Sequence, residues 1–336
     1  MSTDHVAEFV ADVTYHGKSE RTRDAYERVL REFEAFLGER GETPATADRR
    51  DCMAYIHSLR GDHADSTVAT YASYLNRFYR YMTEIGAFDS NPMALVREEM
   101  SESVDTDPTR RDISLPEMRS FVADVAHPLD RALICTLLKT GIRVGELCNL
   151  DCRDLALSDE ALVDAFDLGT RPQLSGRPDS LYVAADIRAG ERVGGEVRTA
   201  SNKRERTTTI PVDDELAAVL RRWLAIRPDG DSTALFTSTR DAWGERLTPD
   251  AVRSIVTDHA ADRGWYRPGD GADGNVTPHY FRHFFTTHLR DRTGDRGIVK
   301  YLRGDVASDV IDTYTHDWGD RVRETYEANV YRLFPT

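Results

Sequence analysis

Residues 277–289, TPHYFRHFFTTHL, concentrate side chains that could do chemistry: three of the chain's ten histidines and one arginine. In a helix, His279, Arg282 and His283 stand at i, i+3 and i+4 and share one face. A zinc site, a polar part of the core and a phosphate clamp are each consistent with this pattern. A zinc-protease helix needs a glutamate beside its first histidine, and Tyr280 occupies that place. A phosphate clamp and a helix with solvated histidines remain as the main alternatives.

Two further segments carry positive charge that could bind a phosphate. Arg143 and Glu146, in TGIRVGEL, are three positions apart, so Glu146 could hold the guanidinium, although such a pair is often an ordinary surface ion pair. Lys203, Arg204 and Arg206, in ASNKRERTTTIPV, stand in a turn before a predicted strand. The chain has only four lysines, so a lysine inside this basic run is informative. The alternative is a solvated hairpin tip.

The C-terminal segment YLRGDVASDVIDTYTH places Tyr314 nine positions after Asp305. By itself, a tyrosine at such a place usually serves packing. In this order and within one chain, however, the three segments resemble the tyrosine recombinase (phage integrase) family, in particular its Xer-like members. HYFRH matches the family's His-x-x-Arg-His, TGIRVGEL its first arginine box, and the C-terminal segment its final motif, which ends in Tyr-Thr-His. The resemblance covers most of the chain.

The resemblance implies cutting and rejoining of DNA without metal, ATP or another cofactor. Arg143 and Arg282 would neutralise the nonbridging oxygens of a phosphodiester, most strongly as charge grows in the transition state. Tyr314 would attack phosphorus and form a 3′-phosphotyrosine link. His279 would accept or donate a proton, and Lys203 would protonate the 5′-oxygen that leaves.

Three residues are expected to support these catalytic groups. Glu146 and His283 would orient the first arginine and the site. Asp305 stands where the family often has histidine or tryptophan, and a carboxylate there would repel a phosphate unless it turns toward a basic group such as Arg303. His288 is expected to be a core histidine instead.

The region around the lysine departs from the family's pattern. Counting back from Pro211 as in the family reaches Arg206, but Lys203 is preferred because arginine hardly deprotonates and is a poor proton donor. The stretch between Arg143 and Lys203 is also longer than in the family. Residues 159–198 are therefore interpreted as an insertion in or beside a sheet.

Hydrophobic periodicity predicts two domains and a mainly α fold. Apolar residues at helical spacing predict helices at 20–37 and 65–86, with a shorter one between them. No alternating strand pattern occurs before residue 100. The prediction is therefore a helical, SAM-like, DNA-binding core-binding domain of about four helices at 1–100 and a linker at 101–112. An α+β catalytic domain with a small antiparallel sheet would occupy 113–336.

Within the second domain, Ser114 and Glu117 form a capping-box pattern that predicts the start of a helix. The segments SLYVAADI and RTTTIPV predict a strand pair with an elaborate connection. In the first domain, Ser66 is expected to cap the helix at 65–86. The aromatic residues of that helix are expected to lie mostly in the core: Tyr71, Tyr74, Phe78 and Tyr81.

Basic side chains are the candidates for contacts with the DNA backbone, which position DNA without reading its sequence. In the first domain these are Arg21, Arg23, Arg77 and Arg80. In the second they are Arg204 and Arg206. The expected partner is double-stranded DNA, with self-association into a ring of four protomers on paired sites. An apolar stripe in the last helix, Val322, Tyr326, Val330 and Leu333, is consistent with docking on a neighbouring protomer, or with packing on its own domain.

Composition gives further expectations. The chain has 336 residues, 58 acidic and 44 basic, for a net charge of −14. An acidic, lysine-poor surface resembles that of proteins from salt-loving organisms, so a halophilic archaeal source is expected. The chain contains no apolar run of membrane-spanning length and its first residues do not resemble a signal peptide, so we expect a cytoplasmic protein without a membrane partner. The four cysteines are expected to serve as small apolar side chains.

Two alternative functions stay open. One is a DNA-binding protein of the same fold with weakened or absent cleavage, for which Asp305 is the warning sign. The other is a DNA-relaxing enzyme similar to type IB topoisomerases, which shares the chemistry without a preferred site. The target DNA site, the choice between integration and dimer resolution, accessory proteins, and delivery of the tyrosine in cis or in trans do not follow from the sequence.

Overall fold

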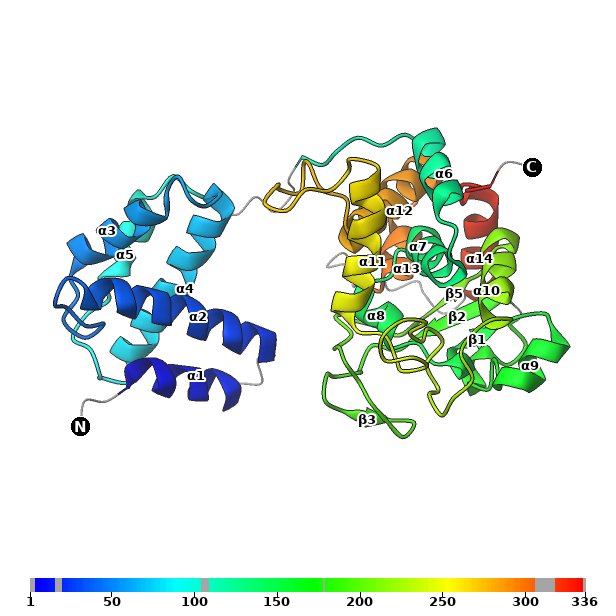
Figure 1. The fold of residues 1–336 in the computed structure, drawn as a ribbon, viewed down its shortest axis with the longest axis horizontal. Coiled ribbons are helices and arrows are strands. Elements are labelled where there is room, and N and C mark those ends of the chain that lie inside the picture. Colours follow the sequence, from blue (N-terminus) through cyan, green and yellow to red (C-terminus); the bar gives the residue numbers. More distant parts are fainter. Residues whose placement is uncertain (1–3, 16–19, 104–108, 178, 306–317, 335–336) are drawn as a thin grey trace. The chain divides into compact units, whose positions relative to one another are not determined.

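The computed structural model describes residues 4–15, 20–103, 109–177, 179–305 and 318–334. The chain divides into two compact units, Met1–Pro108 and Thr109–Thr336, each with its own hydrophobic core. The division falls within the range 101–112 that the sequence predicts as a linker. Both units are mainly helical, and the second contains a small antiparallel sheet, so the predicted fold class is confirmed (Figure 1).

The first unit consists of helices packed around one apolar core. They are α1 (His5–Tyr15), α2 (Glu20–Gly38), α3 (Arg49–Leu59), α4 (Asp65–Glu84) and α5 (Met93–Glu99). Phe33, Leu75 and Phe78 are completely buried between them. Periodicity predicts α2, α3 and α4 but misses α1 and α5. Tyr71 and Phe78 are buried and Tyr74 and Tyr81 pack against the core, so most of the aromatic stripe is core, as expected.

Of the helices in the first unit, α3 begins with a side-chain N-cap and α4 does not. Asp48 caps α3 and accepts hydrogen bonds from the amides of Arg50 and Asp51, which satisfies donors that a helix leaves unpaired. The prediction that Ser66 caps α4 is wrong, because the helix already begins at Asp65 and its N-cap is Ala64, which makes no side-chain bond.

The second unit is built around helix α7 (Pro128–Thr140), which is buried along nearly its whole length. Helices α10 (Asp214–Leu224) and α12 (Pro278–Thr293) pack on it. The capping box of Ser114 and Glu117 opens α6 (Leu115–Asp124), as predicted. The remaining helices are α8 (Val144–Cys148), α9 (Glu160–Phe166), α11 (Pro249–Asp262), α13 (Arg296–Arg303) and α14 (Trp318–Asn329), with short 3-10 turns η1 (Cys152–Asp154) and η2 (Pro172–Leu174).

The sheet of the second unit has the order β1-β2-β5 and is antiparallel. Its strands are β1 (Leu155–Ala156), β2 (Ser180–Val183) and β5 (Thr208–Pro211), with Leu181 opposite Ile210 in the register. The connection from β2 to β5 forms a separate hairpin, β3 (Arg192–Val193) and β4 (Glu196–Val197). The predicted insertion at 159–198 therefore contains α9 and η2 before β2, β2 itself, and this hairpin after it.

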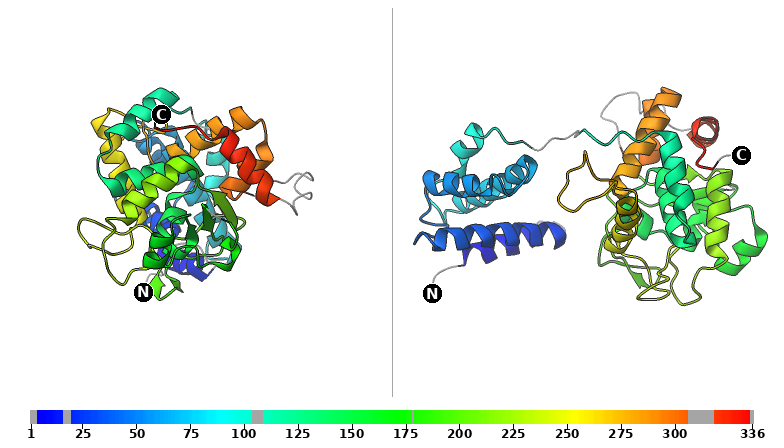
Figure 2. Two further views of the ribbon diagram at one scale, coloured as in Figure 1. Left: turned by 90° about the vertical axis from the view of Figure 1, so that its right-hand side faces the viewer. Right: turned by 45° about the horizontal axis from the view of Figure 1, so that its top comes forward.

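Helix α14 packs on its own unit, against α12 and β5, and Figure 2 shows it in red beside the orange helices. Val322, Tyr326 and Leu333 are at most 2% exposed. The side chain of Lys139, also fully buried, donates from Nζ to Asp213 Oδ2, Glu215 Oε2 and the carbonyl of Tyr331, each at 2.6 Å. The apolar stripe of the last helix is thus covered by its own unit, the second of the two alternatives that the sequence leaves open.

Two observations bear on the other expectations from composition. All four cysteines are free and buried, as expected. None of the helices in the described part of the chain is long and apolar enough to cross a membrane.

Candidate active site

Arg143 and Arg282 come together although they belong to distant segments. Arg143 is the N-cap of α8 and follows Gly141, whose left-handed backbone (φ 63°) ends α7. A Cβ at Gly141 would collide with the ring of Phe285, so this turn requires glycine. Arg282 lies on α12, is 3% exposed, and donates from Nη1 to the carbonyl of Gly141 at 2.6 Å. The loop of the first arginine is therefore bonded directly to the helix of the second.

Glu146 fixes the orientation of Arg143 from a fully buried position. Its carboxylate accepts from the Arg143 backbone amide at 2.9 Å and from Arg143 Nη1 at 3.1 Å. The same carboxylate pairs with Arg204 Nη2 at 3.2 Å. The predicted contact between Arg143 and Glu146 is present, and it belongs to a buried network rather than to the surface.

Asp305 lies between the two arginines. Its Oδ1 is 3.2 Å from Arg143 Nη2 and 3.0 Å from Arg282 Nη2, while its Oδ2 is 2.9 Å from Arg303 Nε. The carboxylate is thus turned toward basic groups, which offset its repulsion of a phosphate. Gly304, with φ 72°, makes the preceding turn, and a Cβ there would collide with the Arg204 side chain.

Burial, together with nearby positive charge, shifts two pKa values in the site. Burial, and then the charges of Arg143 and Arg303, lowers the pKa of Arg282 to about 9. Desolvation and nearby arginines, Arg110 first, lower the pKa of His279 below its usual value. His279 is therefore neutral at pH 7 and able to accept a proton. It lines an open pocket of about 340 Å³, so a substrate could reach it.

Lys203 is exposed in the connection between β2 and β5, and the chain is held by hydrogen bonds on both sides of it. Asn202 accepts from Asn149 Nδ2 at 2.8 Å and donates to the carbonyl of Ala184 at 2.8 Å. On the other side, the backbone amide of Glu205 donates to the carbonyl of Gly304 at 2.9 Å. The backbone at Lys203 is therefore fixed, while its side chain points to solvent without a hydrogen bond or ion pair to other described residues.

Arg204, which is expected to contact DNA, has a buried side chain in the structure. Its side chain is 5% exposed and is bonded to Glu146, to the hydroxyl of Thr208 and to the carbonyl of Leu302. The guanidinium therefore faces other residues of its own unit and not solvent. It instead joins the lysine loop to the first arginine box and to the turn that carries Asp305. Arg206 is partly exposed and lies over the ring of Tyr301, 4.8 Å from its centroid.

The remaining predicted residues are placed as follows. His283 is half-buried on α12 near the ring of Tyr280. His288 stacks on Phe284 at 4.1 Å between ring centroids, and burial lowers its pKa, consistent with a core role. Tyr314 lies outside the described residues.

The basic candidates of the first unit lie on α2 and α4. Arg77 and Arg80 are exposed on α4, and Arg80 pairs with Glu84 at 3.5 Å. Arg23, on α2, pairs with Asp24 at 2.9 Å. Arg21 also belongs to α2, but its side chain is outside the description.

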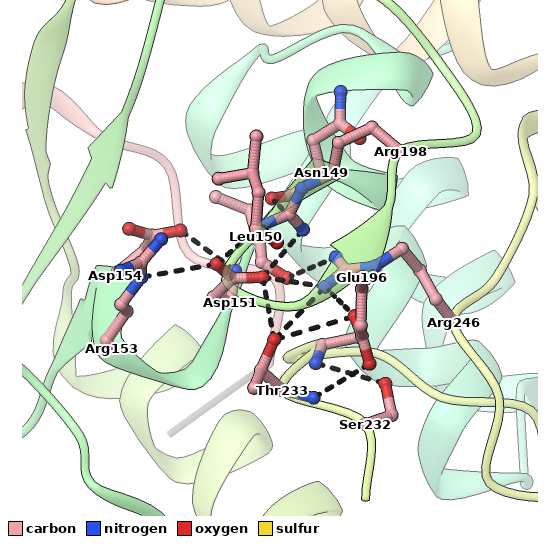
Figure 3. Close-up of polar contacts among 12 residues, drawn as sticks. Asn149, Leu150, Asp151, Arg153, Asp154, Glu196, Arg198, Ser232, Thr233 and Arg246 are labelled. Carbon is pink, nitrogen blue, oxygen red and sulfur yellow. Dashed lines mark hydrogen bonds and ion pairs between the residues drawn. The ribbon is translucent and has the colours of Figure 1, made fainter. Parts of the chain in front are cut away.

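A buried charge cluster anchors the inserted hairpin and was missed by sequence reasoning (Figure 3). Arg198, 1% exposed, forms a bidentate pair with Asp151 through bonds of 2.7 and 2.8 Å. Arg246 donates to Asp151 at 2.7 Å and also pairs with Glu196. Burial alone would raise the pKa of Asp151, but the two arginines outweigh it and lower that pKa. These residues have no common spacing in the sequence, so no pattern indicates them.

Comparison with known proteins matches both units to one family. Residues 185–319 match the model of the phage integrase family, and residues 6–86 match its N-terminal SAM-like domain. Over 323 residues, the chain is 26% identical to tyrosine recombinase XerC of Alcanivorax borkumensis, covering 92% of this chain and 88% of that protein. The chain therefore belongs to the tyrosine recombinase family.

Solved structures show the same fold. A lambda integrase dimer bound to a COC′ core site superposes with a TM-score of 0.63 at 15% identity, covering 94% of this chain and 77% of that one. A lambda integrase tetramer bound to a Holliday junction gives a TM-score of 0.61 at 15% identity, with 91% and 77% covered. No comparison bears on the expected halophilic source.

Proposed function

We propose that the chain is a site-specific DNA recombinase that cleaves and rejoins DNA through a covalent 3′-phosphotyrosyl intermediate. The observation that carries the proposal is the convergence of Arg143 and Arg282 on a single carboxylate oxygen, at 3.2 and 3.0 Å. Two guanidiniums that share one oxygen form a preorganised site for an anion. This is the arrangement that a phosphodiester needs, because its negative charge repels nucleophiles.

Tyr314 is the proposed nucleophile, on the strength of its motif alone. Its oxygen forms a bond to phosphorus as the bond from phosphorus to the 5′-oxygen breaks. The DNA 3′-phosphate stays on the tyrosine, and the 5′-oxygen leaves as a hydroxyl. Because the phosphotyrosyl link conserves the energy of the phosphodiester, attack by a 5′-hydroxyl can reverse the step without a cofactor.

His279 and Lys203 are proposed to move the two protons of this reaction. The lowered pKa of His279 keeps its imidazole neutral, so it can accept the tyrosine proton. Lys203 is exposed on an anchored loop and would donate a proton to the leaving 5′-oxygen. Glu146, His283 and Asp305 would support the arginines.

The proposed partner is double-stranded DNA. The lambda integrase structures hold DNA, one of them as a tetramer on a Holliday junction, which supports DNA binding and self-association here. We propose 1–100 as a DNA-binding domain, 101–112 as a linker and 113–336 as the catalytic domain. Backbone contacts are assigned to Arg21, Arg23, Arg77, Arg80 and Arg206. Because α14 packs on its own unit here, an exchange of this helix in a tetramer would require its release.

One observation favours an alternative function. Asp305 forms ion pairs with both Arg143 and Arg282, the two groups that would bind a phosphate. Such a blocked site is expected for a protein that binds DNA without cutting it. A site-independent relaxing enzyme is a further possibility that shares the chemistry. The experiment below separates these functions.

The test uses pooled, nicked DNA fragments from the region flanking the coding sequence, each labelled at the 5′ end of the nicked strand. Wild type, Tyr314→Phe and the control Tyr15→Phe, at an exposed tyrosine of α1, are incubated with them. Denaturing gels should show label travelling with wild type and the control, and none with Tyr314→Phe. A shift on native gels without covalent label in any sample would support the binding-only function. Relaxation of any supercoiled plasmid would support the relaxing enzyme.

A further inference from the structure

Among the described residues, two carboxylates contact Arg143 or Arg282, and they differ in one physical respect. The Glu146 side chain is fully buried and bonded on several sides, so it cannot leave. The Asp305 side chain is 26% exposed, so solvent and a solute can reach it. Only Asp305 touches both Arg143 and Arg282. A group that is accessible and bonded to both arginines is one that an incoming anion can replace.

The geometry at Asp305 is that of a bound anion. One oxygen, Oδ1, accepts from both guanidiniums at 3.2 and 3.0 Å, as a nonbridging phosphate oxygen would. The second oxygen faces the third guanidinium, that of Arg303, at 2.9 Å. The carboxylate can therefore turn toward Arg303 and keep a charged partner when its first oxygen is displaced.

The charges explain why such a group is needed before substrate binds. Arg143, Arg282 and Arg303 each have a guanidinium nitrogen within 3.2 Å of Asp305, and Arg282 is buried. Three like charges at this separation repel one another, and a negative group among them offsets that repulsion. Without Asp305, the Arg143 side chain, which is 31% exposed, would keep Glu146 as its charged partner but would lose the contact that aligns it with Arg282.

We infer that Asp305 occupies the phosphate position of the DNA-free chain, where it holds Arg143 and Arg282 in their binding geometry until a substrate phosphate displaces it. This inference rests on the proposed function, since it assigns the arginine pair to phosphate. Asp305 is a positioning residue that acts through the arginines. An anion must compete with an internal carboxylate, so weakly bound anions are rejected and a phosphate held in place by the rest of the DNA is favoured.

The test measures binding of inorganic phosphate to the full chain by calorimetry. Asp305→Asn keeps the shape of the side chain and removes the competing charge. It should bind phosphate at least about tenfold more tightly than wild type, because charge-assisted bonds to the carboxylate no longer have to be broken. Asp291→Asn is the control, since it removes one exposed negative charge from α12 outside the cluster. An equal gain in the control would show a general charge effect and overturn the inference, as would an affinity of Asp305→Asn within twofold of wild type.

A second arm depends on Arg143. In an Arg143→Ala background, Asp305→Asn should raise the affinity for phosphate by less than about threefold. The reason is that the carboxylate and the phosphate no longer compete for both arginines, Arg143 and Arg282. A gain that persists undiminished would place the phosphate elsewhere and reject the inference. If Asp305→Asn does not fold, Asp305→Ser replaces it with the same expectations. Phosphate binding does not require Tyr314, so these results stand apart from the DNA-cleavage test of the proposed function.

Discussion

At the scale of single residues, the two arginines of the site are not equivalent. Arg282 donates to the carbonyls of Gly141 and Arg303 besides pairing with Asp305, so its guanidinium is part of the protein's internal bonding. Arg143 is 31% exposed, and within the described part of the chain its side chain bonds only to Glu146 and Asp305. Arg282 thus combines a structural role with the proposed binding of phosphate. The Arg143 side chain has fewer internal bonds, so phosphate binding is its main proposed role.

His279 allows a prediction of pH dependence. The pKa of His279 is lower in the folded chain than its value of about 6.5 in the unfolded chain, so folding favours the neutral imidazole. The resulting contribution to stability is fully present above about pH 6.5. This contribution to stability is lost as pH falls through the folded pKa. If neutral His279 accepts the tyrosine proton, the rate of covalent attachment to nicked DNA should stay level from pH 8 to about 6.5 and fall below that.

The measurement is the rate of covalent attachment across this pH range for wild type, His279→Gln and the control His57→Gln. His279→Gln should react slowly and without the acid fall, while the control should follow wild type because His57 lies on the other unit. An acid fall of unchanged shape in His279→Gln would assign the titration to another group.

At the scale of elements, the insertion positions the lysine loop. The β3–β4 hairpin is tied to the start of η1 by the buried pair of Arg198 and Asp151, and the chain leaves this anchor directly toward Lys203. The loop is held again by Asn149, which donates to the carbonyl of Ala200 at 2.8 Å. A long connection can therefore present a lysine as firmly as a short hairpin.

Substitution of Arg198 by alanine should loosen this loop. Asp151 keeps Arg246 and Arg153 as partners, so we expect a loss in unfolding free energy of about 2–3 kcal/mol, less than for a fully orphaned buried charge. Hydrogen exchange should rise at residues 199–204, and covalent attachment should slow while DNA binding is retained.

Arg192→Ala is the matched control, because Arg192 lies in the same hairpin but is exposed. Urea unfolding and hydrogen exchange with mass spectrometry give the two readouts. A loss of stability in Arg198→Ala without faster exchange at 199–204 would show that the cluster supports the fold and not the loop.

At the scale of the whole molecule, net charge governs the response to salt. With 58 acidic and 44 basic residues the chain carries −14, and self-repulsion opposes the compact state. Raising ionic strength from 0.1 to 1 M shortens the screening length from about 10 to about 3 Å. The urea midpoint of unfolding should therefore rise with potassium chloride over this range.

The control for the salt effect is the same titration near pH 4.5, where many carboxylates are protonated and the rise should shrink. A midpoint that falls with salt at pH 7 would mean that attractive surface ion pairs outweigh the net repulsion. Assays of DNA attachment should be run at each salt concentration, because counterion release weakens DNA binding as salt increases.

The sequence by itself determined the helical first unit, the mixed second unit and the motif residues, because periodicity and short-range spacing are local properties. Local chemistry also predicted the capping box at Ser114 and the pair of Arg143 with Glu146. It could not tell that Arg204 is buried, since a basic run looks solvated until the turn at Gly304 closes over it.

Only the tertiary structure decided which distant groups meet. The contact of Asp305 with Arg143 and Arg282 depends on the packing of α12 and α13 beside the loop after α7. The spacing of residues along the sequence does not reveal this packing. The anchoring of the insertion by Asp151, Arg198 and Arg246 likewise joins three separate segments. Whether the apolar stripe of α14 faces its own unit was open from sequence, because burial of Tyr326 depends on the neighbouring surface and not on the helix that carries it.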